Sequence, residues 1–511
     1  MSALAKFFLA AGNEVSGSDA ADSETTEELR KLGVKIFIGH KAENLTQPER
    51  VIFSAAVRED NPELVEARRL NVKTQKYAEA LGEITREKFT IAISGMHGKS
   101  TTTAMIGLMM EKAGLDPTVI VGTKVREWGN SNFRLGQSQY LVIEADEYDR
   151  SFLNYWPKIL VLLNIEEEHL DTYVGGLPDI MKTFGEYVSH LGEDGVLVAN
   201  GEDANILKIP GLAPARPRAG KNPRPRQVHP AYTGGTRRGG QKSKLQCKVQ
   251  NYNSKLKIDG LCLKVSGKHN LSNAAAAITA ARILGIADKI AVKTLNNFTG
   301  TWRRMEFRGE VNGAKIYDDY GHHPTEIKAT LEGARELLSF PTLKRGIKGD
   351  LNPSQPPFKK GGDHKLYCVF QPHQYQRTYK LFNQFIGSFA DADKVILLPI
   401  YSVAGREKNE IKKKVSSEML AEAIKMQNAK CKVQNDPAQI ASQLYGAGNA
   451  KCKIIKSQDV IYLDSFEKAA NYLKKNLKAG DVCVIMGAGD IYKLTERLIC
   501  KNPRPRQACP A

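Results

Sequence analysis

The chain has 511 residues, of which 41% are hydrophobic, so it can bury large cores and should form about three domains. No run approaches the roughly 18 apolar residues that a membrane-spanning helix needs, and no basic-then-apolar leader follows Met1, so we expect a cytoplasmic protein with no membrane partner. Eight cysteines without a C-x-x-C pair predict reduced, structural thiols.

The net charge of +18 is concentrated in three segments. Residues 211–244 hold nine Lys or Arg and no acid, residues 341–363 hold five against two acids, and residues 498–511 hold three, which together supply 15 of the 18 net charges. Because these segments are rich in Pro and Gly, we expect two disordered insertions and a basic tail. Tyr232 is the only aromatic residue of the first segment, which disfavours a nucleic-acid partner, although an RNA-binding arm remains an alternative.

The first 88 residues alternate between predicted helices and strands, as a small Rossmann-like domain does. The opening strand and glycine loop of such a domain are missing, because Met1 already lies in the first predicted helix. Asp19 ends the first predicted strand, where an acid can accept hydrogen bonds from a ribose or a base edge. A lone acid at this place is also typical of a solvated turn. The expected elements are a helix in 1–12, strands at 14–19, 34–38 and 51–54, and a helix from Asn61.

A phosphate-binding loop follows at residues 95–100, with the sequence GMHGKS. Residues 89–94 alternate β-branched and small apolar side chains, which predicts a buried strand, and residues 101–112 have helical spacing. Glycines turn backbone N–H groups toward an anion, Lys99 can reach the β and γ phosphates, and Ser100 can bind Mg²⁺. Ile93 stands where the usual motif has its first glycine, so the prediction depends on the flanking strand and helix.

Two polar clusters follow the next predicted strands. The strand at 140–143 is followed by EADEYD, and the strand at 159–163 is followed by NIEEEHLD. Ligands lie beyond the carboxyl ends of strands in an open α/β sheet, so both clusters should converge on the phosphate loop. Mg²⁺ prefers oxygen ligands, which Ser100, the phosphates and Glu144 can supply, and His169 can add an imidazole.

The remainder of the chain carries further polar clusters. GKHNLSN at 267–273 precedes an alanine-rich helix that should be capped by its Asn or Ser, and His269 and Asn273 can share one helical face. TWRRME at 301–306 offers paired guanidiniums that suit phosphate recognition. The later clusters also follow predicted strands, so residues from 301 onward form a further α/β domain; they are DDYGHHPTE at 318–326, QPHQYQRT at 371–378 and the glycine turn that ends DVCVIMGAGD at 481–490.

Together these motifs, in this order, resemble those of the Mur ligases, and the similarity extends over nearly the whole chain outside the basic segments. SGSD at 16–19 and GMHGKSTTT at 95–103 belong to the same set. The resemblance implies an α/β protein of three-domain Mur ligase architecture. The expected domains are a truncated UDP-sugar-binding domain at 1–88, a central P-loop ATPase at 89–300 with the 211–244 insertion, and a Rossmann-like C-terminal domain at 301–511 with the 341–363 insertion and the 498–511 tail.

The resemblance also implies ATP and Mg²⁺ as cofactors and assigns residues to each function. The implied catalytic residues are Lys99, His169, His322 and Arg377. The implied ATP-binding residues are Gly95, His97, Gly98, Lys99, Ser100, Thr101, His269, Asn273, Arg304 and Asp319. The implied metal ligands are Ser100, Glu144 and His169, and the implied substrate-binding residues are Asp19, Ser54, Tyr320 and His373.

Within the family, the motifs are most similar to those of members that add L-alanine to the lactyl carboxylate of UDP-N-acetylmuramate, through an acyl phosphate, in peptidoglycan biosynthesis. A recycling ligase that joins a murein tripeptide to the same nucleotide sugar is the nearest alternative, since EADEYD fits both, whereas QPHQYQRT favours the alanine enzyme. A degraded, non-catalytic homologue is a further alternative because of the missing opening strand and the insertions.

Overall fold

The computed structural model describes residues 1–169, 172–209, 248–253, 258–339, 364–402, 409–433 and 458–499. The predicted insertions at 211–244 and 341–363 and all but the first two residues of the predicted tail lie outside the described residues. The chain divides into two compact units. Unit 1 comprises Met1–Lys264 and His269–Thr301, and unit 2 comprises Val265–Lys268 and the chain from Trp302 onward.

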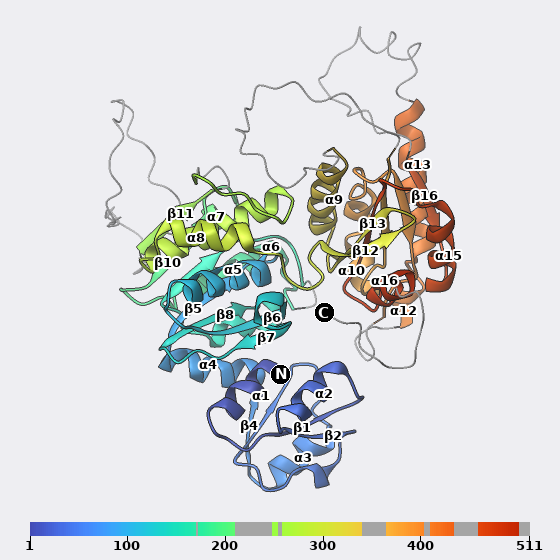
Figure 1. Cartoon of the computed structure of the whole chain (residues 1–511). Coiled ribbons are helices and arrows are strands. Elements are labelled where there is room, and N and C mark those ends of the chain that lie inside the picture. The colour runs from blue at the N-terminus through green and yellow to red at the C-terminus, as the bar shows by residue number, and fades with distance from the viewer. Residues whose placement is uncertain are drawn as a thin grey trace, which may run out of the picture. The chain divides into compact units, whose positions relative to one another are not determined.

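The first part of unit 1 alternates helices with short parallel strands, as predicted (Figure 1). Its strands form two separate pairs, β1 with β2 and β3 with β4, rather than one continuous sheet. Asn61 caps α3, because its side-chain oxygen accepts the Glu63 N–H at 2.9 Å. The elements are α1 (Ser2–Ala10), β1 (Ser16–Asp19), α2 (Glu24–Lys31), β2 (Lys35–Ile38), η1 (Ala42–Asn44), β3 (Arg50–Phe53), α3 (Pro62–Arg69), β4 (Lys73–Lys76) and α4 (Tyr77–Glu87).

The second part of unit 1 is built on a seven-stranded sheet in the order β11-β10-β9-β5-β8-β6-β7, parallel except for β7. The predicted strand at 89–94 is confirmed as β5, whose central position buries it on both faces. The elements are β5 (Phe89–Ser94), α5 (Lys99–Lys112), β6 (Thr118–Val125), η2 (Arg126–Trp128), β7 (Ser131–Arg134), β8 (Tyr140–Ala145), η3 (Tyr148–Asn154), β9 (Ile159–Leu162), α6 (Leu177–Val188), β10 (Val196–Asn200), η4 (Ile206–Lys208), β11 (Lys248–Tyr252), α7 (Lys268–Ile283) and α8 (Asp288–Asn297).

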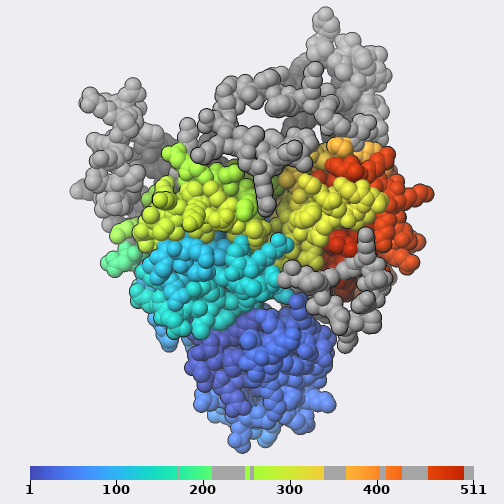
Figure 2. Space-filling view, in the orientation of Figure 1, coloured from blue at the N-terminus to red at the C-terminus, as the bar shows by residue number. Residues whose placement is uncertain are grey.

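Helix α5 is buried along most of its length. Residues 101–110 are all inaccessible, because the helix packs against the sheet on one side and against α8 on the other. In the space-filling view, the yellow-green surface of unit 1 belongs to α7 and α8 (Figure 2). The helix begins at Lys99, two residues earlier than expected, so Lys99 and Ser100 lie in its first turn.

Helix α7 also begins earlier than the sequence indicated. It starts at Lys268, directly after Gly267, whose φ of 98° makes the turn into the helix. Asn270 and Ser272 therefore lie within the helix, and the prediction that one of them caps it was wrong. His269 and Asn273 do fall one turn apart on this helix, as predicted.

Unit 2 contains a six-stranded sheet in the order β12-β13-β17-β14-β15-β16, with β12 antiparallel and the other strands parallel. The predicted strands that precede its polar clusters are present as β13, β14 and β17. The elements are β12 (Glu306–Val311), β13 (Ala314–Asp319), α9 (Pro324–Ser339), β14 (Leu366–Phe370), α10 (Tyr375–Lys380), α11 (Phe382–Ile386), β15 (Lys394–Leu397), α12 (Asn409–Lys412), α13 (Ser417–Val433), β16 (Asp459–Tyr462), α15 (Phe466–Asn476), β17 (Val482–Met486) and α16 (Tyr492–Ile499).

Cys262, Cys368 and Cys483 are free thiols. None of the described helices is both long enough and apolar enough to cross a bilayer.

A buried arginine joins three strand ends of unit 2. The Arg303 guanidinium is 2% exposed and donates to Asp318 Oδ1 at 3.0 Å and to the Gly487 carbonyl at 2.6 Å. Burial raises the pKa of Asp318 to about 6, although the positive charge of Arg303 acts to lower it. Because Arg303 precedes β12, Asp318 lies on β13 and Gly487 follows β17, this ion pair fixes the edge of the sheet that carries the polar clusters.

We expect Arg303→Met to lower the free energy of unfolding at pH 8 by about 3–5 kcal/mol, because it leaves the ionised Asp318 buried without its partner. Lys468→Met is the control in the same unit, since it removes the exposed pair between Lys468 and Asp464 and should change the free energy of unfolding little. Chemical denaturation followed by circular dichroism measures both. Equal stability of the two variants would contradict a structural role for Arg303.

Candidate active site

The loop between β5 and α5 passes so close to its neighbours at its two glycines that a side chain there would clash. A Cβ on Gly98, whose φ is 86°, would lie 2.4 Å from Asn273 Oδ1 on α7. A Cβ on Gly95, whose φ is 131°, would lie 3.0 Å from the backbone N and O of Asn164. The two glycines therefore permit both the turn of the backbone and the close approach of neighbouring segments. The first backbone N–H groups of α5, which have no partner within the helix, face the loop.

Lys99 lies beneath this loop and binds a buried carboxylate. Its Nζ donates to the Gly95 carbonyl at 2.7 Å and to the two Glu147 oxygens at 2.8 and 3.1 Å. Glu147 is completely buried. Burial opposes the charge of Lys99, but the carboxylates of Glu147 and Asp146 outweigh it and raise the pKa of the lysine. Lys99 is therefore a permanent cation at the base of the loop.

Ser100 and Glu144 form a second polar contact at the same strand ends. The Ser100 hydroxyl donates to Glu144 Oε2 at 3.1 Å, and the Gly122 N–H donates to Glu144 Oε1 at 2.5 Å. Burial raises the pKa of Glu144, while these donors and Lys99 favour its ionised form. The predicted pair of Ser100 with Glu144 is therefore brought together, and two oxygen ligands suited to Mg²⁺ lie side by side.

His169 lies at the end of the neighbouring strand and shares Glu147 with Lys99. Its Nε2 is 3.3 Å from Glu147 Oε1. Burial opposes its charge, but the hydrogen bond to Glu147 and the nearby Glu168 outweigh burial, and the pKa of His169 is raised. One ligand atom from each of Asp146, Glu147 and His169 lies within 4.8 Å of the others, so this set fits a divalent cation.

Three of the described non-glycine residues with positive φ follow β8 and β9. His169, Asp149 and Arg150 have φ values of 50°, 52° and 53°, a region that residues other than glycine rarely occupy. Arg150 is held by Asp179 on α6 at 3.0 Å. Positive φ at non-glycine residues is typical of functional sites, where the surrounding contacts enforce it.

The other predicted residues of the central part lie around the loop. Asn273 contacts Gly98, His269 lies one turn before Asn273 on α7, and Thr101 is buried in the first turn of α5. His97 exchanges two backbone hydrogen bonds with the Asn164 side chain. His97 thus lies within the phosphate loop, and Thr101 and Asn273 lie next to it.

Asp19 and Ser54 lie in the first part of unit 1 with ordinary turn contacts. Asp19 is exposed and accepts the Ala21 N–H, and Ser54 accepts the Ala56 N–H. A hydrogen-bonded group that the sequence analysis did not single out lies beside Asp19. Ser18 Oγ donates to Glu63 at 2.7 Å and contacts His40 Nδ1 at 3.1 Å.

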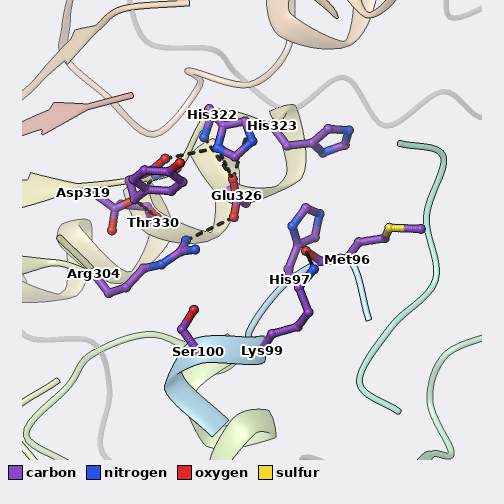
Figure 3. Close-up of polar contacts among 12 residues, drawn as sticks. Met96, His97, Lys99, Ser100, Arg304, Asp319, His322, His323, Glu326 and Thr330 are labelled. Carbon is purple, nitrogen blue, oxygen red and sulfur yellow. Dashed lines mark hydrogen bonds and ion pairs between the residues drawn. The ribbon is translucent and has the colours of Figure 1, made fainter. Parts of the chain in front are cut away.

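In unit 2 the predicted residues gather at the ends of β13 and β14. Arg304 donates to Glu326 at 3.1 Å, and the His322 N–H donates to the same carboxylate at 2.9 Å (Figure 3). Asp319 is 3% exposed and accepts the N–H groups of Met305 and Gly321, both at 2.8 Å. Burial raises its pKa. Asp319 therefore orders the strand end that carries Arg304.

A second group in unit 2 surrounds His373. Its ring is stacked on Tyr401 with centroids 5.5 Å apart, and its Nδ1 is 3.3 Å from the Arg377 guanidinium. The rings of His322 and His373 are 5.9 Å apart, and those of His322 and Tyr320 are 5.5 Å apart. Tyr320 and His373, predicted to bind substrate, and His322 and Arg377, predicted to be catalytic, are thus brought together on one edge of the unit 2 sheet.

Known families match this chain along most of its length. The models described as "Mur ligase family, catalytic domain", "Mur ligase middle domain" and "Mur ligase, glutamate ligase domain" match residues 1–89, 93–281 and 303–489. The chain is 36% identical over 503 residues to the UDP-N-acetylmuramate–L-alanine ligase of Acetivibrio thermocellus, covering 98% of this chain and 93% of that protein. The chain belongs to the Mur ligase family.

A second relative supports this assignment, and two solved structures have a similar fold. The ligase of the same name from Clostridium botulinum strain Langeland is 37% identical over 98% of this chain and 95% of the relative. The fold is similar to that of the UDP-N-acetylmuramate-alanine ligase of Thermotoga maritima, with a TM-score of 0.65, 22% identity, and coverage of 98% and 95%. It is also similar to a murein peptide ligase from Psychrobacter arcticus, with a TM-score of 0.60, 21% identity and the same coverage.

This Mur ligase contains candidate site residues that the sequence analysis did not select. Glu147 holds both Lys99 and His169, Glu326 holds Arg304 and His322, and Asn164 holds the phosphate loop. Each lies in a motif already recognised, but the sequence gives no signal for which of several neighbouring acids is buried. The roles of Glu144 and His169 as metal ligands stay predictions. Glu144 contacts Ser100, whereas His169 contacts Glu147.

The pKa of His169 provides a direct test of the Glu147 contact. A raised pKa means that the imidazolium stabilises the fold fully below about pH 6.5, and that this contribution is lost as the pH rises through the raised value. Glu147→Gln should lower the pKa of His169, whereas Glu167→Gln, at an exposed acid of the same loop, should change it little. NMR titration of the imidazole in protein without nucleotide measures both. An unchanged pKa in Glu147→Gln would show that Glu147 does not set the charge of His169.

Proposed function

We propose that this protein uses ATP to join L-alanine to the lactyl carboxylate of UDP-N-acetylmuramate. The observation that carries the proposal is the glycine loop with Lys99 at its base, flanked by two carboxylate groups at the ends of β8 and β9. The names of the curated relatives, which are at least 36% identical over 98% of this chain in the two cases above, support the choice of substrates. We assign the reaction to peptidoglycan biosynthesis and the protein to the cytoplasm.

The chemistry requires activation of a carboxylate, which is a poor acyl donor. An oxygen of the lactyl carboxylate attacks the γ phosphorus of ATP, the bond to the β–γ bridging oxygen breaks, and ADP and an acyl phosphate result. The neutral amine of L-alanine then attacks the acyl carbon and loses a proton, and inorganic phosphate leaves. Two anions approach each other in the first step, so a fixed cation such as Lys99 lowers its barrier.

Two sets of residues fit divalent cations. Ser100 and Glu144 would hold one cation, and His169 with Glu147 and Asp146 would hold the other. A bound Mg²⁺ neutralises negative charge on the phosphate oxygens as the transfer proceeds. Most of the ligand atoms are oxygens, which Mg²⁺ prefers. The positive φ of His169 is typical of residues at functional sites.

The remaining residues follow the same proposal. The phosphates are bound by Gly95, Gly98 and the first turn of α5. The nucleotide site is contacted or ordered by His97, His269, Asn273, Arg304 and Asp319. Tyr320, His322, His373 and Arg377 orient the amino acid and the acyl phosphate, supported by the contacts of His373 with Tyr401 and Arg377. Asp19 and Ser54 bind the nucleotide sugar. The division of the chain at residues 88 and 300 remains a prediction as well.

Lys99→Ala should lower the rate of alanine-dependent phosphate release by at least about 10²-fold, because it removes the cation that meets the transferred phosphoryl group. Lys112→Ala is the matched control, since Lys112 ends the same helix with its side chain exposed. A coupled phosphate assay with UDP-N-acetylmuramate, ATP and L-alanine measures the rate, and circular dichroism checks the fold. Turnover of Lys99→Ala at the rate of the control would rule out this active site.

The choice of acceptor separates the proposal from the recycling ligase. We expect kcat/KM for L-alanine to exceed that for the murein tripeptide, because the acceptor residues His373 and Arg377 belong to the motif that favours the alanine enzyme. The same phosphate assay with each acceptor, at equal concentrations of ATP and nucleotide sugar, gives the two values. A preference for the tripeptide would assign the recycling reaction instead, and no turnover with either acceptor would indicate a non-catalytic homologue.

A further inference from the structure

We infer that Asn164 is a positioning residue for ATP, because it holds the backbone of the phosphate loop from outside. The inference rests on the proposed function, since it assigns the residue that shapes the nucleotide site. Asn164 follows β9 and comes from a different strand than the loop it contacts. Neither the metal sets nor the proposed reaction gives it a role of its own.

The Asn164 side chain bonds both peptide groups of one loop residue. The His97 N–H donates to Asn164 Oδ1 at 2.8 Å, and Asn164 Nδ2 donates to the His97 carbonyl at 2.9 Å. The Met96 N–H donates to the Asn164 backbone carbonyl at 3.3 Å. Only a primary amide offers a donor and an acceptor in the spacing of a peptide group, so a carboxylate or a hydroxyl cannot replace it.

Asn164 itself is fixed by the turn that follows β10. Asn200 Nδ2 donates to the Leu163 carbonyl at 2.9 Å, on one side of Asn164. On the other side, Asp203 accepts the Ile165 N–H at 3.1 Å, and Asn205 donates to the Ile165 carbonyl at 2.8 Å. The peptide groups before and after Asn164 are therefore held by three side chains, and its amide has a fixed position from which to hold the loop.

These contacts decide which loop amides can face an anion. The N–H groups of Met96 and His97 point to Asn164, so the phosphate cradle is left to the N–H groups that follow, at the glycine turn and the first turn of α5. The close approach of Gly95 to Asn164 maintains the same arrangement from the backbone side. Asn164 thus determines which backbone N–H groups of the loop face the anion. Its loss should lower the affinity for nucleotide more than it lowers the rate of the chemical step.

Asn164→Ala and Asn164→Asp test the inference. Calorimetric titration with ADP and Mg²⁺ should give a dissociation constant about 10- to 100-fold higher for both variants than for the wild-type protein, because both lose the donor to the His97 carbonyl. In the phosphate assay, KM for ATP should rise by a similar factor, while kcat at saturating ATP and KM for L-alanine change little. Asn205→Ala, one contact further from the loop, should give a smaller increase. Asn297→Ala is the control, because its exposed side chain bonds the carbonyl of Lys293 on the same helix, α8.

Each outcome decides the matter. Unchanged nucleotide affinity in Asn164→Ala, whatever happens to its melting temperature or to kcat, would overturn the inference and leave Asn164 a structural residue. Nucleotide binding by the wild-type protein without alanine-dependent turnover would overturn the proposed function alone, since the binding comparison still tests Asn164. Failure of the wild-type protein to bind ADP would overturn both.

Discussion

The structure of the candidate site depends on one steric constraint, the close packing around the loop between β5 and α5. A Cβ at Gly98 would overlap the Asn273 amide, and a Cβ at Gly95 would press on the Asn164 backbone. Because both neighbours come from other elements, α7 and the end of β9, the loop is enclosed on two sides. Such a loop can present backbone N–H groups to an anion without first being ordered by it, which reduces the entropic cost of binding.

The electrostatics of the site follow from the burial of Glu147. One completely buried carboxylate faces the Lys99 ammonium at 2.8 Å and the His169 imidazole at 3.3 Å, so burial and attraction act against each other on all three groups. Attraction prevails, because the pKa of Glu147 is lowered while those of Lys99 and His169 are raised. The contacts with Glu147 therefore favour the charged forms of Lys99 and His169, although both side chains are largely buried.

The sequence predicted most of the architecture because its strongest signals are local. The strand at 89–94 shows a buried apolar pattern, and each polar cluster follows such a strand, so parallel pairing alone brings the clusters to one edge of a sheet. The helix starts were less well predicted. Helix α5 begins at Lys99 without a side-chain cap, and α7 begins at Lys268, ahead of the expected capping residues. The separate β1–β2 and β3–β4 pairs were also not foreseen, because strand pairing is a long-range property that four-residue strands do not encode.

The residues that sequence reasoning could not separate are neighbours of the same type. In unit 2, Arg303 is buried against Asp318, whereas the adjacent Arg304 bonds Glu326 at the sheet edge. Asp318 and Asp319 end the same strand, and because successive side chains of a strand point to opposite faces, one serves the buried ion pair and the other accepts the N–H groups of Met305 and Gly321. The resemblance to the Mur ligases distinguished Arg304 and Asp319 from their neighbours, but only the contacts explain why both members of each pair are charged.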